Sequence, residues 1–227
     1  RGLRGLGETY PAGAGDFWSW REAMYDLVLR LTPAEMKQLC RLAFQEMLAT
    51  GFTTVGEFHY LHHSNVGADA GRLEDGDFAF DAIVLEAAAE VGIRIVLLQS
   101  FYKTGAIGRP LAGGQRRFAT PDVDAFVRQV DRTSALLRGP LQTIGIAPHS
   151  LRAVPPEDLV HLHQIARERG WVCHVHIEEQ RKEIEEAVTA LGTPPLEWFL
   201  ANLPLGPHFT MIHATHSSEQ NLRRYVD

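Results

Sequence analysis

The sequence predicts an α/β fold, a partial (β/α)8 barrel of the TIM type, from three observations. Apolar runs typical of buried strands alternate with helical patterns along the 227 residues. Polar side chains stand at the C-terminal end of each predicted strand, where barrels place their ligand sites, whereas a doubly wound sheet would gather them at one switch point. A complete barrel has eight strands and about 250 residues. We therefore expect five to six strands, with the first and last strands missing, and residues 1–227 as a single catalytic barrel domain truncated at both ends.

The expected elements follow from local pattern. Thr32-Pro33-Ala34-Glu35 predicts a helix start, because Thr caps, Pro suits the first helical position and Glu stands three residues after the cap. Residues 103–117 predict a Gly-rich loop. The expected strands are residues 52–60, 93–102, 142–150, 171–177 and 209–216. The expected helices are residues 16–30, 32–50, 78–91, 121–137, 155–170, 180–191 and 195–202.

Composition narrows the class of protein. The net charge is −6 and the basic residues form no run, which argues against a nucleic-acid partner. No apolar run reaches the roughly 18–20 residues that a membrane span needs. Two cysteines make no disulfide framework, so a reducing, cytoplasmic location is expected. For the parent protein we also consider a homodimer.

His174-Val-His176-Ile-Glu-Glu179 is the sharpest local motif. Residues two apart in a strand share a face, and His176 is the one nearer the C-terminal rim. A neutral imidazole is a good ligand for zinc or Fe²⁺, so His176 is the predicted metal ligand. Glu179 lies just past the strand and is a candidate proton carrier. The alternative is one core histidine beside one exposed histidine.

Two further strand ends carry candidate residues. His213 is predicted to be catalytic, with a second metal-ligand role as the alternative, while His216 is expected to form loop hydrogen bonds. His149 and Arg152 suit a carboxylate-bearing substrate, because a guanidinium binds a carboxylate through two hydrogen bonds. The alternative for Arg152 is a surface ion pair with Asp158 or Glu157.

The first predicted strand and the Gly-rich loop carry further candidate residues. Tyr60 could hydrogen-bond a substrate, and the adjacent pair His62-His63 is expected to be solvated rather than metal-binding. Three arginines in the loop suggest a mobile lid that meets substrate carboxylates: Arg109, Arg116 and Arg117. Cys173 should point away from His174, so a Cys–His nucleophile is not expected.

Five strings in this order, EFHYLHH, GGQRRF, APHSLRAV, HVHIEEQ and MIHATH, resemble the formimidoylglutamate deiminases of histidine degradation, within the amidohydrolase superfamily. The resemblance covers essentially the whole chain. One departure is Glu178, where the family motif has a small residue.

The resemblance implies a role for each candidate. His176 would be the metal ligand of the fifth barrel strand, His213 the catalytic histidine of the sixth, and Glu179 the group that contacts the formimino group and moves protons. One divalent metal is implied, zinc first and Fe²⁺ second, together with a small dicarboxylate substrate. Substrate-binding roles are implied for Tyr60, His149, Arg152 and Glu179.

The implied reaction is the hydrolysis of N-formimino-L-glutamate to N-formyl-L-glutamate and ammonia. The paired histidines and the aspartate that complete the family's metal site should lie outside the 227 residues, so we expect the chain alone to be inactive. A related amidohydrolase that deaminates another amidine or an aminopurine is the first alternative. A non-catalytic barrel fragment is the alternative of another class.

Overall fold

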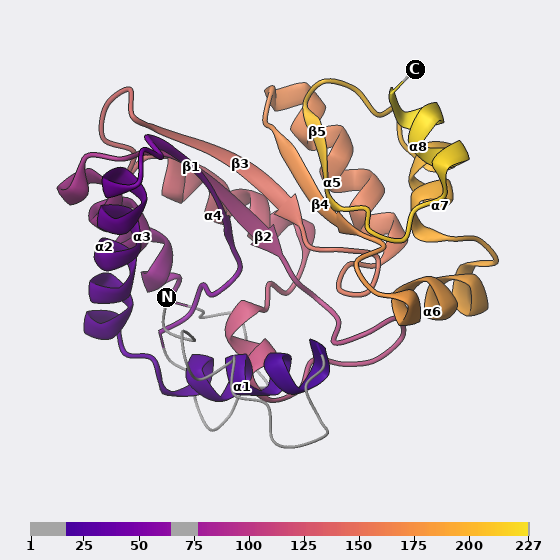
Figure 1. The fold of residues 1–227 in the computed structure, drawn as a ribbon, viewed down its shortest axis with the longest axis horizontal. Coiled ribbons are helices and arrows are strands. Elements are labelled where there is room, and N and C mark those ends of the chain that lie inside the picture. The colour runs from indigo at the N-terminus through magenta and orange to yellow at the C-terminus, as the bar shows by residue number, and fades with distance from the viewer. Residues whose placement is uncertain (1–16, 65–76, 227) are drawn as a thin grey trace. The chain divides into compact units, whose positions relative to one another are not determined.

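The structure is a computed structural model that describes residues 17–64 and 77–226. Strands and helices alternate along most of the chain (Figure 1). The strands are β1 Thr54–His59, β2 Arg94–Phe101, β3 Gln142–Pro148, β4 Cys173–Ile177 and β5 Phe209–His213. The helices are α1 Phe17–Arg30, α2 Pro33–Ala49, α3 Ala79–Val91, the 3₁₀ helix η2 Gly113–Phe118, α4 Val123–Ser134, α5 Pro156–Arg169, α6 Arg181–Leu191, α7 Pro195–Asn202 and α8 Glu219–Val226.

The strands form one sheet whose spatial order is the chain order, β1-β2-β3-β4-β5. Strands β4 and β5 pair in parallel, with Cys173 opposite Phe209 and Ile177 opposite His213. Sequential parallel strands joined by helices are the repeating unit of a (β/α) barrel, so the predicted α/β fold of a partial barrel is confirmed. Helix α8 is an element that the sequence patterns did not predict.

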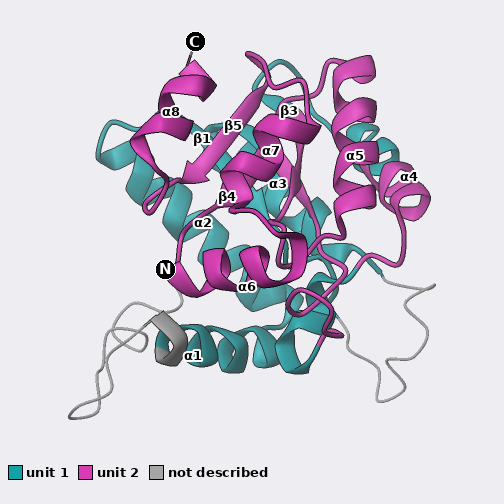
Figure 2. Cartoon of the chain, turned by 90° about the vertical axis from the view of Figure 1, so that its right-hand side faces the viewer, with its two compact units in different colours: residues 1–97, 112–119, 131–143 teal, residues 98–111, 120–130, 144–227 magenta. Residues whose placement is uncertain are grey.

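The chain divides into two compact units (Figure 2). Unit 1 comprises residues 1–97, 112–119 and 131–143, and unit 2 comprises residues 98–111, 120–130 and 144–227. The expectation of one catalytic barrel domain stays a prediction.

Each unit has its own apolar interior. In unit 1, helices α2 and α3 pack side by side, with Phe44 of α2 and Val84 of α3 both buried (Figure 1). In unit 2, the buried residues come from strands and helices alike, among them Phe126, Val175 and Phe199. Gly145 marks the closest approach in this unit, because a Cβ there would lie 2.5 Å from the Val172 side chain. A larger residue would push β3 away from the start of β4.

Local signals set the helix ends. The predicted capping box is present: Thr32 Oγ1 accepts from the Glu35 N–H, and the Glu35 carboxylate accepts from the Thr32 N–H. Three helices end at a left-handed glycine: Gly92, Gly170 and Gly192. Among the helices of the described ranges, none is both long enough and apolar enough to cross a membrane.

Candidate active site

Three predicted histidines meet at the C-terminal ends of strands in unit 2. His149 follows β3, His176 lies on β4, and His213 is the last residue of β5. The His149 and His176 rings stack, with centroids 4.8 Å apart and planes 7° apart. The His176 and His213 rings lie 4.9 Å apart and are inclined by 52°. Parallel pairing brings the strand ends to one edge, which explains why residues far apart in sequence meet here.

His176 has the electrostatic character of a metal ligand. Burial lowers its pKa to about 3, and the neighbouring charges of His213 and Arg152 act in the same direction. Its imidazole is therefore neutral at physiological pH, and a neutral imidazole is the form that binds a metal. The donor chemistry fits the predicted role, which remains a prediction.

Glu179, Arg152 and His213 form a contact chain beside these rings. The Arg152 Nη2 donates a long hydrogen bond of 3.5 Å to Glu179 Oε2. The other carboxylate oxygen, Oε1, lies 3.5 Å from His213 Nε2. Arg152 is buried and contacts acidic groups within the site, so the alternative of a surface pair with Asp158 is wrong; Asp158 instead pairs with Lys103.

The backbone is left-handed at both turns that carry the site. Glu178, after β4, has φ 51°, and at the end of β5 His213 has φ 73° and Ala214 has φ 51°. Non-glycine residues rarely adopt this conformation, and its cost of about 1–3 kcal/mol each is typical of functional sites. The strain therefore coincides with the predicted catalytic positions.

Glu178, the departure from the family motif, has a structural role. Its side chain is buried, and Oε1 accepts a hydrogen bond of 3.0 Å from the Leu196 N–H in the first turn of α7. A carboxylate at a helix N-terminus satisfies a backbone donor and complements the helix dipole. The acid at this position thus joins the β4 turn to α7.

Tyr60 belongs to unit 1. Its hydroxyl donates to Met24 Sδ at 3.3 Å, and its ring packs edge-on against Phe118 at 4.8 Å. Its predicted contact with substrate stays a prediction.

Unit 1 contains a second polar cluster, the Asp81 cluster, made of His59, His62 and Asp81. His59 Nε2 and His62 Nδ1 both lie 2.8 Å from Asp81 Oδ1, and all three side chains are buried. The expectation that His62 and His63 are solvated is wrong. His62 is buried against the Asp81 carboxylate of α3. His63 is also buried, and its Nε2 lies 2.9 Å from the Ala119 carbonyl oxygen.

The Asp81 cluster offers three donor atoms within 4.8 Å of one another and is a group that could hold a metal ion. Tetrahedral zinc with bonds of about 2.0–2.1 Å would keep its ligand atoms roughly 3.3 Å apart. The observed 2.8 Å separations are instead ordinary hydrogen-bond lengths. The geometry favours two histidines donating to one carboxylate oxygen.

The arginines of the Gly-rich loop separate into two kinds. Arg109 and Arg116 are exposed, whereas Arg117 is buried and donates to four backbone carbonyls. The expectation of a lid arginine is therefore wrong for Arg117, because its guanidinium donates hydrogen bonds to backbone carbonyls of several segments of unit 1. The carbonyls belong to Val28, Leu31, His63 and Ser64.

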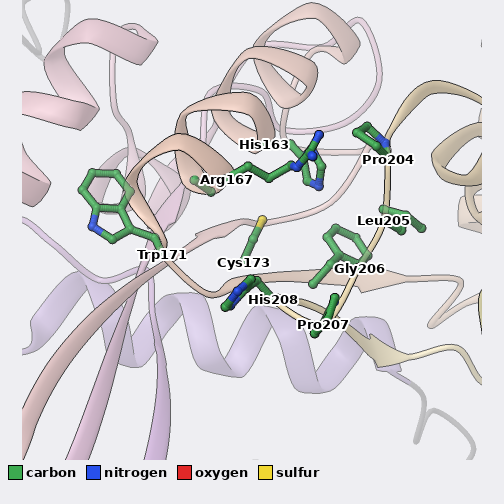
Figure 3. A pocket seen from close by; sticks show the side chains of 11 residues that line it. His163, Arg167, Trp171, Cys173, Pro204, Leu205, Gly206, Pro207 and His208 are labelled. Carbon is green, nitrogen blue, oxygen red and sulfur yellow. The ribbon is translucent and has the colours of Figure 1, made fainter.

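A cavity of about 300 Å³ lies at the opposite strand ends of unit 2, lined by Cys173 at the start of β4 and by Phe209 at the start of β5 (Figure 3). Arg167 and Trp171 also line it. Burial raises the pKa of the Cys173 thiol to about 12, so it stays protonated. His149, His176 and His213 are not among the residues that line this cavity, so it is distinct from the histidine cluster.

Sequence reasoning missed two acids, Asp81 and Glu183. Glu183 is buried in the first turn of α6, and its Oε2 lies 3.9 Å from Arg152 Nε. The spacing between Glu183 and Ala187 could have predicted that Glu183 is buried. Residues four apart share a helix face, and Ala187 is apolar and buried.

Comparison with known proteins decides the family. The profile of the amidohydrolase family matches residues 5–222. The chain belongs to the amidohydrolase family. It is 34% identical to the formimidoylglutamate deiminase of Pseudomonas aeruginosa over 221 residues, which are 96% of this chain and 47% of that protein. It is 25% identical to a 5-methylthioadenosine/S-adenosylhomocysteine deaminase of Shouchella clausii, over 96% of this chain and 43% of that protein.

Solved structures agree on the fold. An amidohydrolase from Brucella melitensis superposes with a TM-score of 0.83 at 34% identity, covering 98% of this chain and 49% of that one. An adenosine deaminase from Xanthomonas campestris, whose structure contains zinc, gives a TM-score of 0.70 at 17% identity over 91% of this chain and 41% of that one. The chain spans about half the length of the relatives it matches.

Proposed function

We propose that the protein containing this chain is a metal-dependent formimidoylglutamate deiminase, which converts N-formimino-L-glutamate and water to N-formyl-L-glutamate and ammonia. The observation that carries this proposal is the convergence of His176, His213, Glu179 and Arg152 at the C-terminal ends of β3–β5. The relative of that name provides independent support at 34% identity.

His176 is the proposed metal ligand of this chain, with zinc as the first candidate and Fe²⁺ as the second. A divalent metal would supply Lewis-acid activation of the attacking water at neutral pH. The neutral imidazole of His176 suits this role. A catalytic zinc normally has three protein ligands, so the other donors must come from elsewhere in the whole protein.

Proton transfer falls to Glu179 and His213. Their facing atoms are 3.5 Å apart, so a proton taken up by one side chain can reach the other with little movement. Addition of water to the amidine carbon requires a base to remove one proton. Loss of ammonia then requires an acid to protonate the leaving nitrogen, and this pair can serve both steps.

Arg152, His149 and Tyr60 are the proposed substrate-binding residues. The Arg152 guanidinium is well suited to a substrate carboxylate, because it can donate two parallel hydrogen bonds. His149 stacks on His176 and contacts the Tyr102 ring, which fixes its plane beside the proposed metal ligand. A small dicarboxylate is therefore the proposed substrate class. For the whole protein, we also propose a cytoplasmic location and a homodimeric assembly.

The test uses the full-length protein loaded with zinc. Incubation with N-formimino-L-glutamate should release one ammonia and one N-formyl-L-glutamate per substrate. An Arg152→Ala variant should raise KM far more than it lowers kcat, because a uniform binding contact is lost. Absence of ammonia release by the wild type would refute the proposal.

Deamination of an aminopurine is the second candidate, since a relative at 25% identity is named for such substrates. A purine site needs no guanidinium to match a carboxylate. If 5-methylthioadenosine is deaminated and Arg152→Ala leaves its KM unchanged, this candidate replaces the first. If the full-length protein turns over neither substrate and binds no metal, the results favour the alternative of a non-catalytic barrel.

A further inference from the structure

Glu183 has no place in the proposed reaction, yet it contacts two residues that do. It lies in the first turn of α6, and only 1% of its surface is exposed. Its Oε2 accepts a hydrogen bond of 3.2 Å from the backbone N–H of Glu179. The side chain therefore reaches back across the turn that joins β4 to α6 and fixes the backbone from which the Glu179 carboxylate projects.

The same carboxylate oxygen faces Arg152. Glu183 Oε2 lies 3.9 Å from Arg152 Nε, while Arg152 Nη2 donates to Glu179 Oε2 at 3.5 Å. Glu183, Arg152 and Glu179 thus form a closed triangle of contacts. A guanidinium that contacts two carboxylates has less freedom to rotate than one held at a single point.

A purely structural role explains this acid poorly. Accepting one backbone N–H needs only a neutral oxygen, and burying a carboxylate is costly. Glu183 Oε1 is buried and accepts no hydrogen bond from the residues that the structure describes. Burial raises the pKa of Glu183 to about 7, and the nearby charge of Glu179 adds to this, whereas Arg152 and the N–H groups of Glu179 and Glu178 act against it.

We propose that Glu183 is a positioning residue that holds the Arg152 guanidinium and the Glu179 turn in the geometry needed for substrate binding and proton transfer. This inference rests on the proposed function for its kinetic consequences. The contacts themselves exist independently of the substrate.

The experiment compares Glu183→Gln and Glu183→Ala in the full-length, zinc-loaded protein, with Glu185→Gln as the matched control. Glu185 is on the same helix and is exposed. Glutamine keeps an oxygen for the Glu179 N–H but loses the charge that faces Arg152. The expected result for Glu183→Gln is a rise in KM for N-formimino-L-glutamate of about tenfold with kcat unchanged.

Glu183→Ala removes both contacts. Its kcat should fall by about 10–100-fold in addition to the KM effect, as is usual for residues that orient catalytic groups. Glu185→Gln should match the wild type. The proposal is overturned if both Glu183 variants keep wild-type kcat and KM, or if KM is unchanged and the apparent kcat falls only in proportion to the folded fraction measured by circular dichroism.

A second measurement separates this inference from the proposed function. The Arg152 Nε–H signal is assigned in arginine-labelled protein by comparison with Arg152→Lys. It should shift and exchange faster with water in Glu183→Gln, and remain unchanged in Glu185→Gln. If the wild type releases no ammonia, the proposed function fails, and the Arg152 signal still decides the positioning role: an unchanged signal in Glu183→Gln overturns it.

Discussion

The Asp81 cluster of unit 1 and the histidine cluster of unit 2 use the same residue types in different ways. In the Asp81 cluster, two imidazoles lie 2.8 Å from one carboxylate oxygen. In unit 2, the two Glu179 carboxylate oxygens lie 3.5 Å from Arg152 Nη2 and 3.5 Å from His213 Nε2. Short bonds to a complementary partner fix a structure, whereas looser contacts leave side chains able to bind and react.

The pKa values express the same difference. Burial by itself would raise the pKa of Asp81. The positive charges of His62 and His59, and the hydrogen bonds that they donate, outweigh the effect of burial and hold this pKa well below the usual range. For Glu183 in unit 2, burial prevails and raises the pKa to about 7. Two imidazoles facing one oxygen hold Asp81 ionised, whereas the contacts of Glu183 with the Glu179 N–H and with Arg152 do not offset the effect of its burial.

The largest expected effect is on the unit 2 cluster. In the full-length protein, His176→Ala should abolish stoichiometric metal binding and lower ammonia release by more than about 100-fold, since loss of a ligand exceeds the effect of its outer partners. Metal content is measured by mass spectrometry. His208→Ala, an exposed histidine of the same unit, is the control. Retention of metal in His176→Ala together with its loss in His62→Ala would place the metal at the Asp81 cluster.

Asp81→Ala should be the most destabilising change in unit 1. It leaves two buried imidazoles without their shared acceptor, at a cost of about 4 kcal/mol in the free energy of unfolding. Metal content should not change. Because the folded pKa of Asp81 is depressed, the contribution it makes to stability is present above pH 4 and is lost as pH falls.

Urea unfolding at pH 7 and at pH 3 measures this effect. The difference between wild type and Asp81→Ala should shrink at the lower pH. Glu86→Ala on the same helix removes only a surface ion pair and should cost less than about 1 kcal/mol. Equal losses in the two variants would contradict a hydrogen-bonded role for Asp81.

Glu183→Gln should change the pH dependence of stability. The folded pKa of about 7 lies above the ordinary glutamate pKa of 4.5, so the folded state holds the proton more tightly. Wild-type stability should therefore decline as pH rises from about 5 to 7, by on the order of 3 kcal/mol. Glutamine cannot ionise, and the decline should disappear in the variant. Parallel pH profiles for the two proteins would show that the carboxyl is not perturbed.

Glu178→Ala has the smallest expected effect. It removes the acceptor for the Leu196 N–H at the start of α7, at a cost of about 1 kcal/mol, typical of a lost helix cap. Amide hydrogen exchange should quicken in the first turn of α7 and remain unchanged in α5. Faster exchange throughout unit 2 would mean that Glu178 does more than cap this helix.

Much of the candidate site was predictable because the apolar runs that form strands, and the residues that end them, can be recognised locally in the sequence. His149, His176 and His213 each stand at or just after the end of an apolar run, and parallel strands bring such ends to one edge. Glu183 was not predictable in the same way. Its contact with Arg152 joins residues 31 positions apart, and the spacing that buries it gives no indication of its partner.

By itself, the sequence determined the alternation of helices and strands, the capping box of Thr32 and the strand-end positions of the site histidines, since each depends on residues within a few positions of one another. Only the tertiary structure decided that His62 is buried against Asp81, that Arg117 donates to backbone carbonyls and that Glu183 faces Arg152. Those outcomes depend on which distant groups meet in a low-dielectric interior. There every buried polar group needs a partner, and packing rather than local propensity supplies it.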